Sequence, residues 1–187
     1  MGLGQGIASR AGEEAATDGS LPCGVGGTGS TIPDMEPVAV RISDLRPADR
    51  DEWLVMRARL WPESGLAEHQ REVNAFFAGS LVEPLAVLIA RAEDGAPVGF
   101  AELSIRGYVD GCDTRDVGYL EGWYVEPPYR FRGVGRSLVE ASMAWARARG
   151  CREFASDTEV ENTSSAAAHR ALGFEETARV VLFRKIL

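Results

Sequence analysis

The stretch Tyr119-Leu-Glu-Gly-Trp-Tyr-Val-Glu-Pro-Pro-Tyr-Arg-Phe-Arg-Gly-Val-Gly-Arg-Ser-Leu-Val139 decides the fold of this chain. It is typical of an apolar strand that ends at two prolines and leads through Arg130-x-x-Gly133-x-Gly135 into a helix. Glycines have no Cβ, so the backbone can bend there and bring its N–H groups close to an anion. The start of a helix adds unpaired N–H donors and the positive end of its dipole. The stretch therefore predicts a turn that binds a pyrophosphate.

Two familiar nucleotide-binding motifs do not match this stretch. A dinucleotide-binding fold needs three glycines and an acidic residue at the end of the next strand, and a triphosphate-binding loop needs Gly-Lys-Ser/Thr. Because two glycines in a turn also serve to cap a helix or to permit a tight bend, the segments that follow decide. They are a second apolar segment at 152–157 and a candidate helix that starts at Asn162 and ends in Leu172-Gly-Phe174.

This order of strand, Arg-x-x-Gly-x-Gly, helix, strand, Asn and helix resembles the GCN5-related N-acetyltransferases (GNAT), which use acetyl-coenzyme A (acetyl-CoA). The resemblance covers residues 38–187. It implies transfer of acetyl from acetyl-CoA to the 6′-amine of aminoglycosides, which confers resistance, because shorter motifs resemble the aminoglycoside 6′-N-acetyltransferases. These motifs are Leu60-Trp-Pro62, Gly111-Cys-Asp-Thr114, Leu120-Glu-Gly122, Phe154-Ala-Ser-Asp157 and His169-Arg-Ala-Leu-Gly-Phe-Glu-Glu-Thr177.

The pattern of apolar residues predicts an α/β (α+β) fold with a mixed central sheet. Alternating and short apolar runs predict strands at 38–42, 85–90, 97–105, 119–125, 152–157 and 179–185. Helical spacing and capping residues predict helices at 46–60, 66–78, 134–149 and 162–172. Hairpin strands followed by one β-α-β unit make the sheet mixed, and the GNAT resemblance places helices on both of its faces.

Composition sets the class of protein and of partner. The 187 residues, 45% hydrophobic and 26% charged, suit one globular domain. Residues 1–34 are rich in Gly, Ala, Ser and Thr, which predicts a disordered N-terminal tail before a GNAT domain at 35–187. No run reaches the ~20 apolar residues of a membrane span and no secretory leader is recognisable, so we expect a cytoplasmic protein. The net charge of −8 disfavours a nucleic acid or an anionic membrane as partner and suits a cationic one.

The cysteines and histidines indicate neither a disulfide framework nor a metal site. Cys23, Cys112 and Cys151 are odd in number and widely spaced, and only His69 and His169 supply imidazoles. We therefore expect no metal.

Acetyl transfer to an amine requires the loss of a proton, since an amine such as that of lysine has a pKa near ~10.4. Glu121 lies inside a strand, where a carboxylate must pair internally or face a cationic ligand. Asp157 ends the next strand, where Asp also commonly caps a turn. The resemblance implies that both carboxylates bind the aminoglycoside and makes them the candidate catalytic groups, with Asp157 as the candidate base. It also implies that Trp61 and Tyr108 line the substrate site; without it, Trp61 is a core residue and Tyr108 a loop anchor.

The resemblance also assigns the coenzyme site. The backbone of Trp123, Tyr124 and Val125 is expected to pair with the pantetheine arm. Asn162 either contacts the coenzyme or caps its helix, and His169 either protonates the departing thiolate or is an ordinary core or surface histidine. The expected pyrophosphate contacts come from consecutive residues at the turn: Phe131, Arg132, Gly133, Val134, Gly135 and Arg136.

Two positions depart from the resembled group. Ser64 stands where close relatives carry His, and Ala178 stands where they carry Glu. The range of drugs is therefore open, while the coenzyme motif is complete. A polyamine or a protein amine as acceptor, or a non-catalytic CoA-binding module, are the alternatives. Relatives of this subgroup look dimeric, which implies a homodimer.

Overall fold

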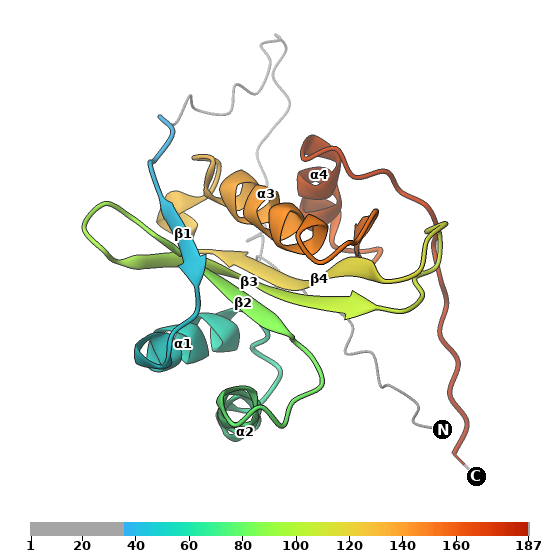
Figure 1. The fold of residues 1–187 in the computed structure, drawn as a ribbon, viewed down its shortest axis with the longest axis horizontal. Helices are drawn as coiled ribbons and strands as arrows, with labels where there is room; N and C mark the ends of the chain where they lie inside the picture. Colours follow the sequence, from blue (N-terminus) through green and yellow to red (C-terminus); the bar gives the residue numbers. More distant parts are fainter. Residues whose placement is uncertain (1–35, 187) are drawn as a thin grey trace, which may run out of the picture.

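A five-stranded sheet in the order β1-β2-β3-β4-β5 organises the chain (Figure 1). The structure, a computed structural model, describes residues 36–186. The first four strands pair antiparallel with their neighbours, and β5 runs parallel to β4. The strands are β1 (Arg41–Asp44), β2 (Ala86–Arg91), β3 (Pro97–Arg106), β4 (Val117–Val125) and β5 (Phe154–Ser156).

Helices cover both faces of the sheet, with α1 and α2 on one side and α3 and α4 on the other (Figure 1). A short 3-10 turn precedes α1 (η1, Pro47–Asp49) and another precedes α3 (η2, Pro127–Tyr129). The expected mixed sheet with helices on both faces is therefore confirmed. The helices are α1 (Arg50–Leu60), α2 (Leu66–Phe77), α3 (Val134–Arg147) and α4 (Thr163–Ala171).

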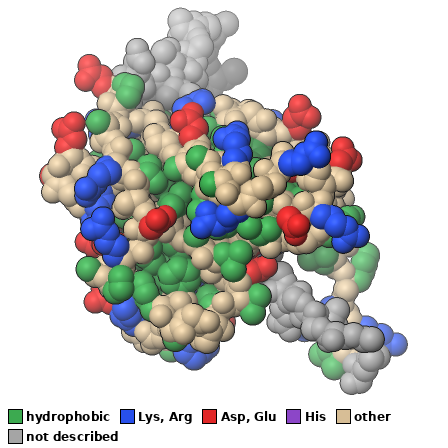
Figure 2. Space-filling view, in the orientation of Figure 1, with side chains coloured by type: hydrophobic (Ala, Val, Ile, Leu, Met, Phe, Trp, Pro, Cys, Tyr) green, Lys and Arg blue, Asp and Glu red, His purple; other side chains and the backbone are tan. Residues whose placement is uncertain are grey.

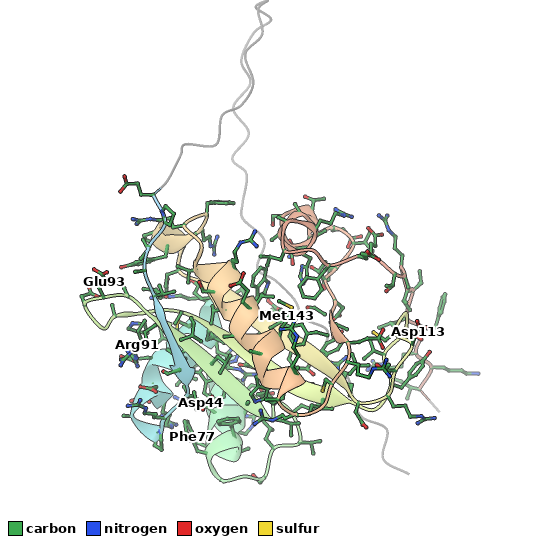
Figure 3. The ribbon with its side chains drawn as sticks, turned by 45° about the horizontal axis from the view of Figure 1, so that its top comes forward. Asp44, Phe77, Arg91, Glu93, Asp113 and Met143 are labelled. Carbon is green, nitrogen blue, oxygen red and sulfur yellow. The ribbon has the colours of Figure 1, made fainter. Side chains whose placement is uncertain are left out.

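Two hydrophobic cores lie on the two faces. In β2, Val87 and Ile89 pack with Trp53 of α1, while Leu88 and Ala90 pack into the cluster that contains α3. A strand that is covered on both faces needs apolar residues at successive positions, which explains the unbroken run in β2. Figure 3 places Glu93, in the β2–β3 turn, and Asp113, in the loop after β3, at opposite ends of the sheet.

The expected strand at 179–185 is wrong. Residues 174–186 contain no helix or strand, and the side chain of Phe183 is 94% exposed. Alternation alone does not make a strand, because the backbone needs a neighbouring strand for its hydrogen bonds. Within residues 36–186 no strand pairs with this segment, which extends away from the sheet (Figure 1).

The other boundaries move by a few residues. The first strand begins at Arg41 instead of 38, because Val38 donates its N–H to the carbonyl of Arg132 and is not part of the sheet. The proposed tail at 1–34 lies outside the described residues. Across the described part of the chain, no helix combines the length and apolar character needed to cross a membrane.

Candidate active site

The turn before α3 leaves backbone N–H groups available to an anion. Phe131 and Gly133 have φ angles of 60° and 87°, so the backbone curls just before the helix begins. The helical ladder starts with Ser137 N–H donating to the carbonyl of Gly133 at 3.0 Å. The N–H groups of 134–136 precede that bond and have no acceptor within the helix by geometry. A Cβ built on Gly133 would meet nothing within 4 Å, so the turn is open to a ligand.

The second half of β4 has a free edge. β4 pairs with β5 only from Gly118 to Leu120, after which the two strands are no longer paired. Within residues 36–186, the backbone of 122–125 therefore has a strand partner on its β3 side alone. A free strand edge can accept an extended ligand through backbone hydrogen bonds. The edge and the turn are therefore candidate places for the pantetheine and the pyrophosphate, and the individual coenzyme contacts stay predictions.

Trp123 joins these two parts to α4. A Cβ on Gly135 would come within 3.1 Å of the Trp123 ring, so the helix start packs directly on this indole. The centre of the Trp123 ring also lies 5.6 Å from the centre of the His169 ring. Gly135 is therefore needed for close packing on Trp123, and an anion contact at this residue stays a prediction.

His169 is held in one tautomer. Its Nδ1 lies 2.8 Å from the carbonyl oxygen of Ser165, and because a carbonyl only accepts, Nδ1 must donate. In the neutral ring Nε2 is then an acceptor, and this atom is buried without a partner among the described residues. This tautomer has no proton on Nε2 to give to a thiolate, so the proposed role of His169 as an acid would require the doubly protonated ring.

Asn162 caps α4. Its side-chain oxygen accepts the N–H of Ser165 at 2.9 Å and the hydroxyl of Ser164 at 3.0 Å. The capping interpretation is confirmed, and a coenzyme contact from Asn162 stays a prediction.

A β-bulge sets the position of Glu121. In the β3–β4 ladder Glu102 pairs with Gly122 and Leu103 pairs with Leu120, so Glu121 is the extra residue. A bulge re-aims the side chain at that position. It places the Glu121 carboxylate beside Ser104, on the face where Tyr119 also lies.

The partner of Glu121 is Arg106. Arg106 Nη2 donates to Glu121 Oε2 at 2.6 Å and Arg106 Nε donates to Oε1 at 3.1 Å, and the Ser104 hydroxyl also donates to Oε1. Burial raises the pKa of Glu121, while the bonds from Arg106 and Ser104 lower it, and the balance lies above the usual value. Of the two interpretations of Glu121, internal pairing is therefore what the structure shows.

Asp157 follows directly after β5 and is bound by Tyr119. Tyr119 Oη donates to Asp157 Oδ1 at 2.5 Å, and the guanidinium carbon of Arg106 lies 3.4 Å from the centre of the Tyr119 ring. Arg106 and Tyr119 thus connect Glu121 to Asp157, and the two predicted carboxylates belong to one cluster. On the face seen in Figure 2, acidic and basic side chains are interspersed, so charge is not of one sign there.

Trp61 and Tyr108 have different environments. Trp61 is 7% exposed, and a Cβ on Gly122 would come within 2.6 Å of its ring, so the indole lies over β4 next to Glu121. The guanidinium carbon of Arg57 lies 4.9 Å from the centre of the Trp61 ring. Tyr108 is 70% exposed in the loop after β3, where its hydroxyl donates to Asp110 at 2.7 Å. The structure therefore brings Trp61 next to the carboxylate strand and leaves Tyr108 at the surface.

Sequence reasoning missed Arg106, Tyr119 and Ser104. Positions 104 and 106 are two apart, a spacing that places side chains on one strand face, whereas the bulge interrupts this alternation at Glu121. That spacing is a weak signal, because the β3–β4 register decides which side chains of β4 lie beside those of β3. Among residues 36–186 no group of three or more His, Cys, Asp or Glu side chains is placed to hold a metal ion.

Comparison with known proteins shows to which family this chain belongs. The model of the family described as "Acetyltransferase (GNAT) family" matches residues 50–174. The chain therefore belongs to the GNAT acetyltransferases, and its sheet has the GNAT fold.

Within this family, the chain is similar to proteins named as aminoglycoside 6′-N-acetyltransferases. Aminoglycoside N(6′)-acetyltransferase type 1 of Klebsiella aerogenes is 51% identical over 146 residues, which is 78% of this chain and 96% of that protein. The protein of the same name from Stenotrophomonas maltophilia is 47% identical, over 78% of this chain and 93% of that one. The structure of AAC(6′)-Iy in complex with the bisubstrate analogue CoA-S-monomethyl-acetylneamine is 41% identical, with a TM-score of 0.73, and covers 80% of this chain and 99% of that one.

Proposed function

We propose that this protein transfers the acetyl group of acetyl-CoA to the 6′-amine of aminoglycoside antibiotics and thereby confers resistance. The observation that carries the proposal is the identity of 51% over 96% of the length of a protein named for that reaction. The cluster of Glu121 and Asp157 beside the free edge of β4 supports it, because a cationic sugar amine needs carboxylates next to the place where the thioester would lie.

Different residues of this chain bind the coenzyme, orient the acceptor and accept its proton. Acetyl-CoA supplies the activated acyl group when it is bound. The N–H groups at the start of α3 hold its phosphates, and the backbone of 123–125 holds the arm in line with the acceptor. Asp157 orients the acceptor ammonium and accepts its proton, directly or through water, because deprotonation must precede attack. Trp61 forms the apolar wall behind the acceptor.

The test is the release of free thiol from acetyl-CoA on addition of kanamycin, spermidine or a lysine peptide. We expect release with kanamycin and a strong reduction of kcat in Asp157→Asn, since this change removes the proton acceptor while keeping the shape. Release with spermidine or peptide alone would favour the other acceptors. No release with any amine, together with retained coenzyme binding, would favour a binding module.

We further infer that the protein works in the cytoplasm, where acetyl-CoA is available, and as a homodimer. Support for the dimer comes from the C-terminal segment, whose side chains Val181, Leu182 and Phe183 are 75%, 85% and 94% exposed. Apolar side chains in such a row favour cover by another surface. Light scattering should give twice the mass of the chain, and removal of 179–187 should shift it to the monomer.

We also propose that residues 35–187 suffice for activity. A protein that starts at Met35 should keep its melting temperature and turnover. A marked loss of either would show that residues 1–34 contribute to the domain.

A further inference from the structure

Arg106 occupies the place where a substrate cation would be expected. Its guanidinium donates to both oxygens of Glu121, at 2.6 Å and 3.1 Å, and Ser104 adds a further donor. This two-point fork is the strongest arrangement an arginine makes with a carboxylate. Glu121 is therefore already neutralised by a cation of its own chain.

The same guanidinium is connected to the second carboxylate, Asp157, through Tyr119. It stacks on Tyr119 with its carbon 3.4 Å from the ring centre, and Tyr119 bonds Asp157 at 2.5 Å. One positive charge is thus linked directly to Glu121 and, through the Tyr119 ring, to Asp157. The side chain of Arg106 is 24% exposed against 12% for Glu121, so Arg106 is the more accessible partner of this pair.

We propose that Arg106 is a resident counter-ion of Glu121, which the ammonium groups of the acceptor displace. The inference rests on the proposed function and adds a selection rule to it. An acceptor with one ammonium makes a point contact and competes poorly with a tethered fork. An acceptor with several ammonium groups engages Asp157 and Glu121 together, which offsets the loss of the Arg106–Glu121 pair. Arg106 therefore favours polycationic acceptors over monoamines.

The direction in which acceptor affinity changes when Arg106 is replaced separates this role from a purely structural one. If Arg106 only held Glu121 in place, its removal would weaken acceptor binding. If Arg106 competes with the acceptor, its removal also relieves repulsion between like charges, and acceptor binding becomes tighter.

The experiment compares Arg106→Gln with the parental protein by calorimetry at low salt, with kanamycin and with glucosamine as a monoamine. We expect a Kd for kanamycin at least threefold lower in Arg106→Gln, and a larger relative gain for glucosamine. Arg50→Gln removes one positive charge from the exposed side of α1, where Arg50 bonds Asn74, and should leave both Kd values unchanged. An unchanged or higher Kd in folded Arg106→Gln would overturn the assignment.

A measurement on the parental protein keeps the inference testable if Arg106→Gln fails to fold. The Nε–H resonance of Arg106, assigned by its absence in Arg106→Lys, should shift and exchange faster with solvent as kanamycin is added. An unchanged resonance at saturating kanamycin would overturn the displacement while leaving the proposed function intact. Absence of any kanamycin binding to the parental protein would instead contradict the proposed function, and the inference with it.

Discussion

The hydroxyl of Tyr119 donates to Asp157 Oδ1 at 2.5 Å and so ties β4 to the residue that follows β5. Burial raises the pKa of Tyr119, and the bond to Asp157 raises it further. The phenol therefore stays protonated at neutral pH. It is a donor that holds the Asp157 carboxylate in place.

Tyr119→Phe should lower kcat/KM for kanamycin by about tenfold or more. A hydrogen bond to a charged group contributes roughly 1.5–3 kcal/mol, and its loss leaves Asp157 free to rotate away from the acceptor. The KM for acetyl-CoA should change little, because the Tyr119 hydroxyl bonds Asp157 and not the proposed coenzyme site. Steady-state kinetics with both substrates check this, and parental acceptor kinetics in the folded variant would remove Tyr119 from the site.

Acceptor binding should weaken on the acid side at a higher pH than an ordinary glutamate predicts. Burial raises the pKa of Glu121 above its usual value of 4.5, so its anion is lost earlier as the pH falls. A profile of KM for kanamycin against pH should show this limb in the parental protein and lack it in Glu121→Gln. The same limb in both proteins would assign it to another group.

The raised pKa of Glu121 affects folding stability in the opposite direction from acceptor binding: a low pH weakens acceptor binding but favours the folded state. The folded protein binds this proton more tightly than the unfolded chain does. The contribution of Glu121 therefore favours folding below pH 4.5 and is lost as the pH rises through its higher folded-state pKa.

Gly122→Ala should displace Trp61 without changing any charge. The new Cβ would lie 2.6 Å from two atoms of the Trp61 ring, so the indole must move. We expect a higher KM for kanamycin and a loss of about 1–3 kcal/mol in the free energy of unfolding, as is typical of overpacking. Gly65→Ala is the matched control, because a Cβ there meets nothing within 4 Å. An unchanged KM would show that Trp61 is only a core residue.

Gly135→Val should abolish most coenzyme binding. Its branched side chain would crowd the N–H groups at the start of α3, and its Cβ would lie 3.1 Å from the Trp123 ring. Calorimetry with acetyl-CoA measures the loss, and Gly65→Val controls for the added bulk. Parental affinity in Gly135→Val would place the pyrophosphate elsewhere.

The local parts of the fold and its class could be predicted from the sequence, whereas the strand register and the pairing of the last segment could not. The turn at Gly133 and the cap at Asn162 depend on neighbours within a few residues, and both are found where they were expected. The bulge at Glu121 and its pairing with Arg106 depend on the register of β3 against β4, which local spacing does not set. The expected strand at 179–185 failed for the same reason, because a strand requires a partner that the pattern of one segment cannot reveal.

The position of the acetyl group on the product tests the central claim most directly. Kanamycin incubated with acetyl-CoA and the protein should release one thiol per drug molecule, and NMR of the product should place one acetyl group on the 6′-nitrogen. An analogue with a hydroxyl in place of the 6′-amine should bind without releasing thiol. Acetylation of a different amine of kanamycin, or efficient acetylation of the 6′-hydroxyl analogue, would contradict the assignment.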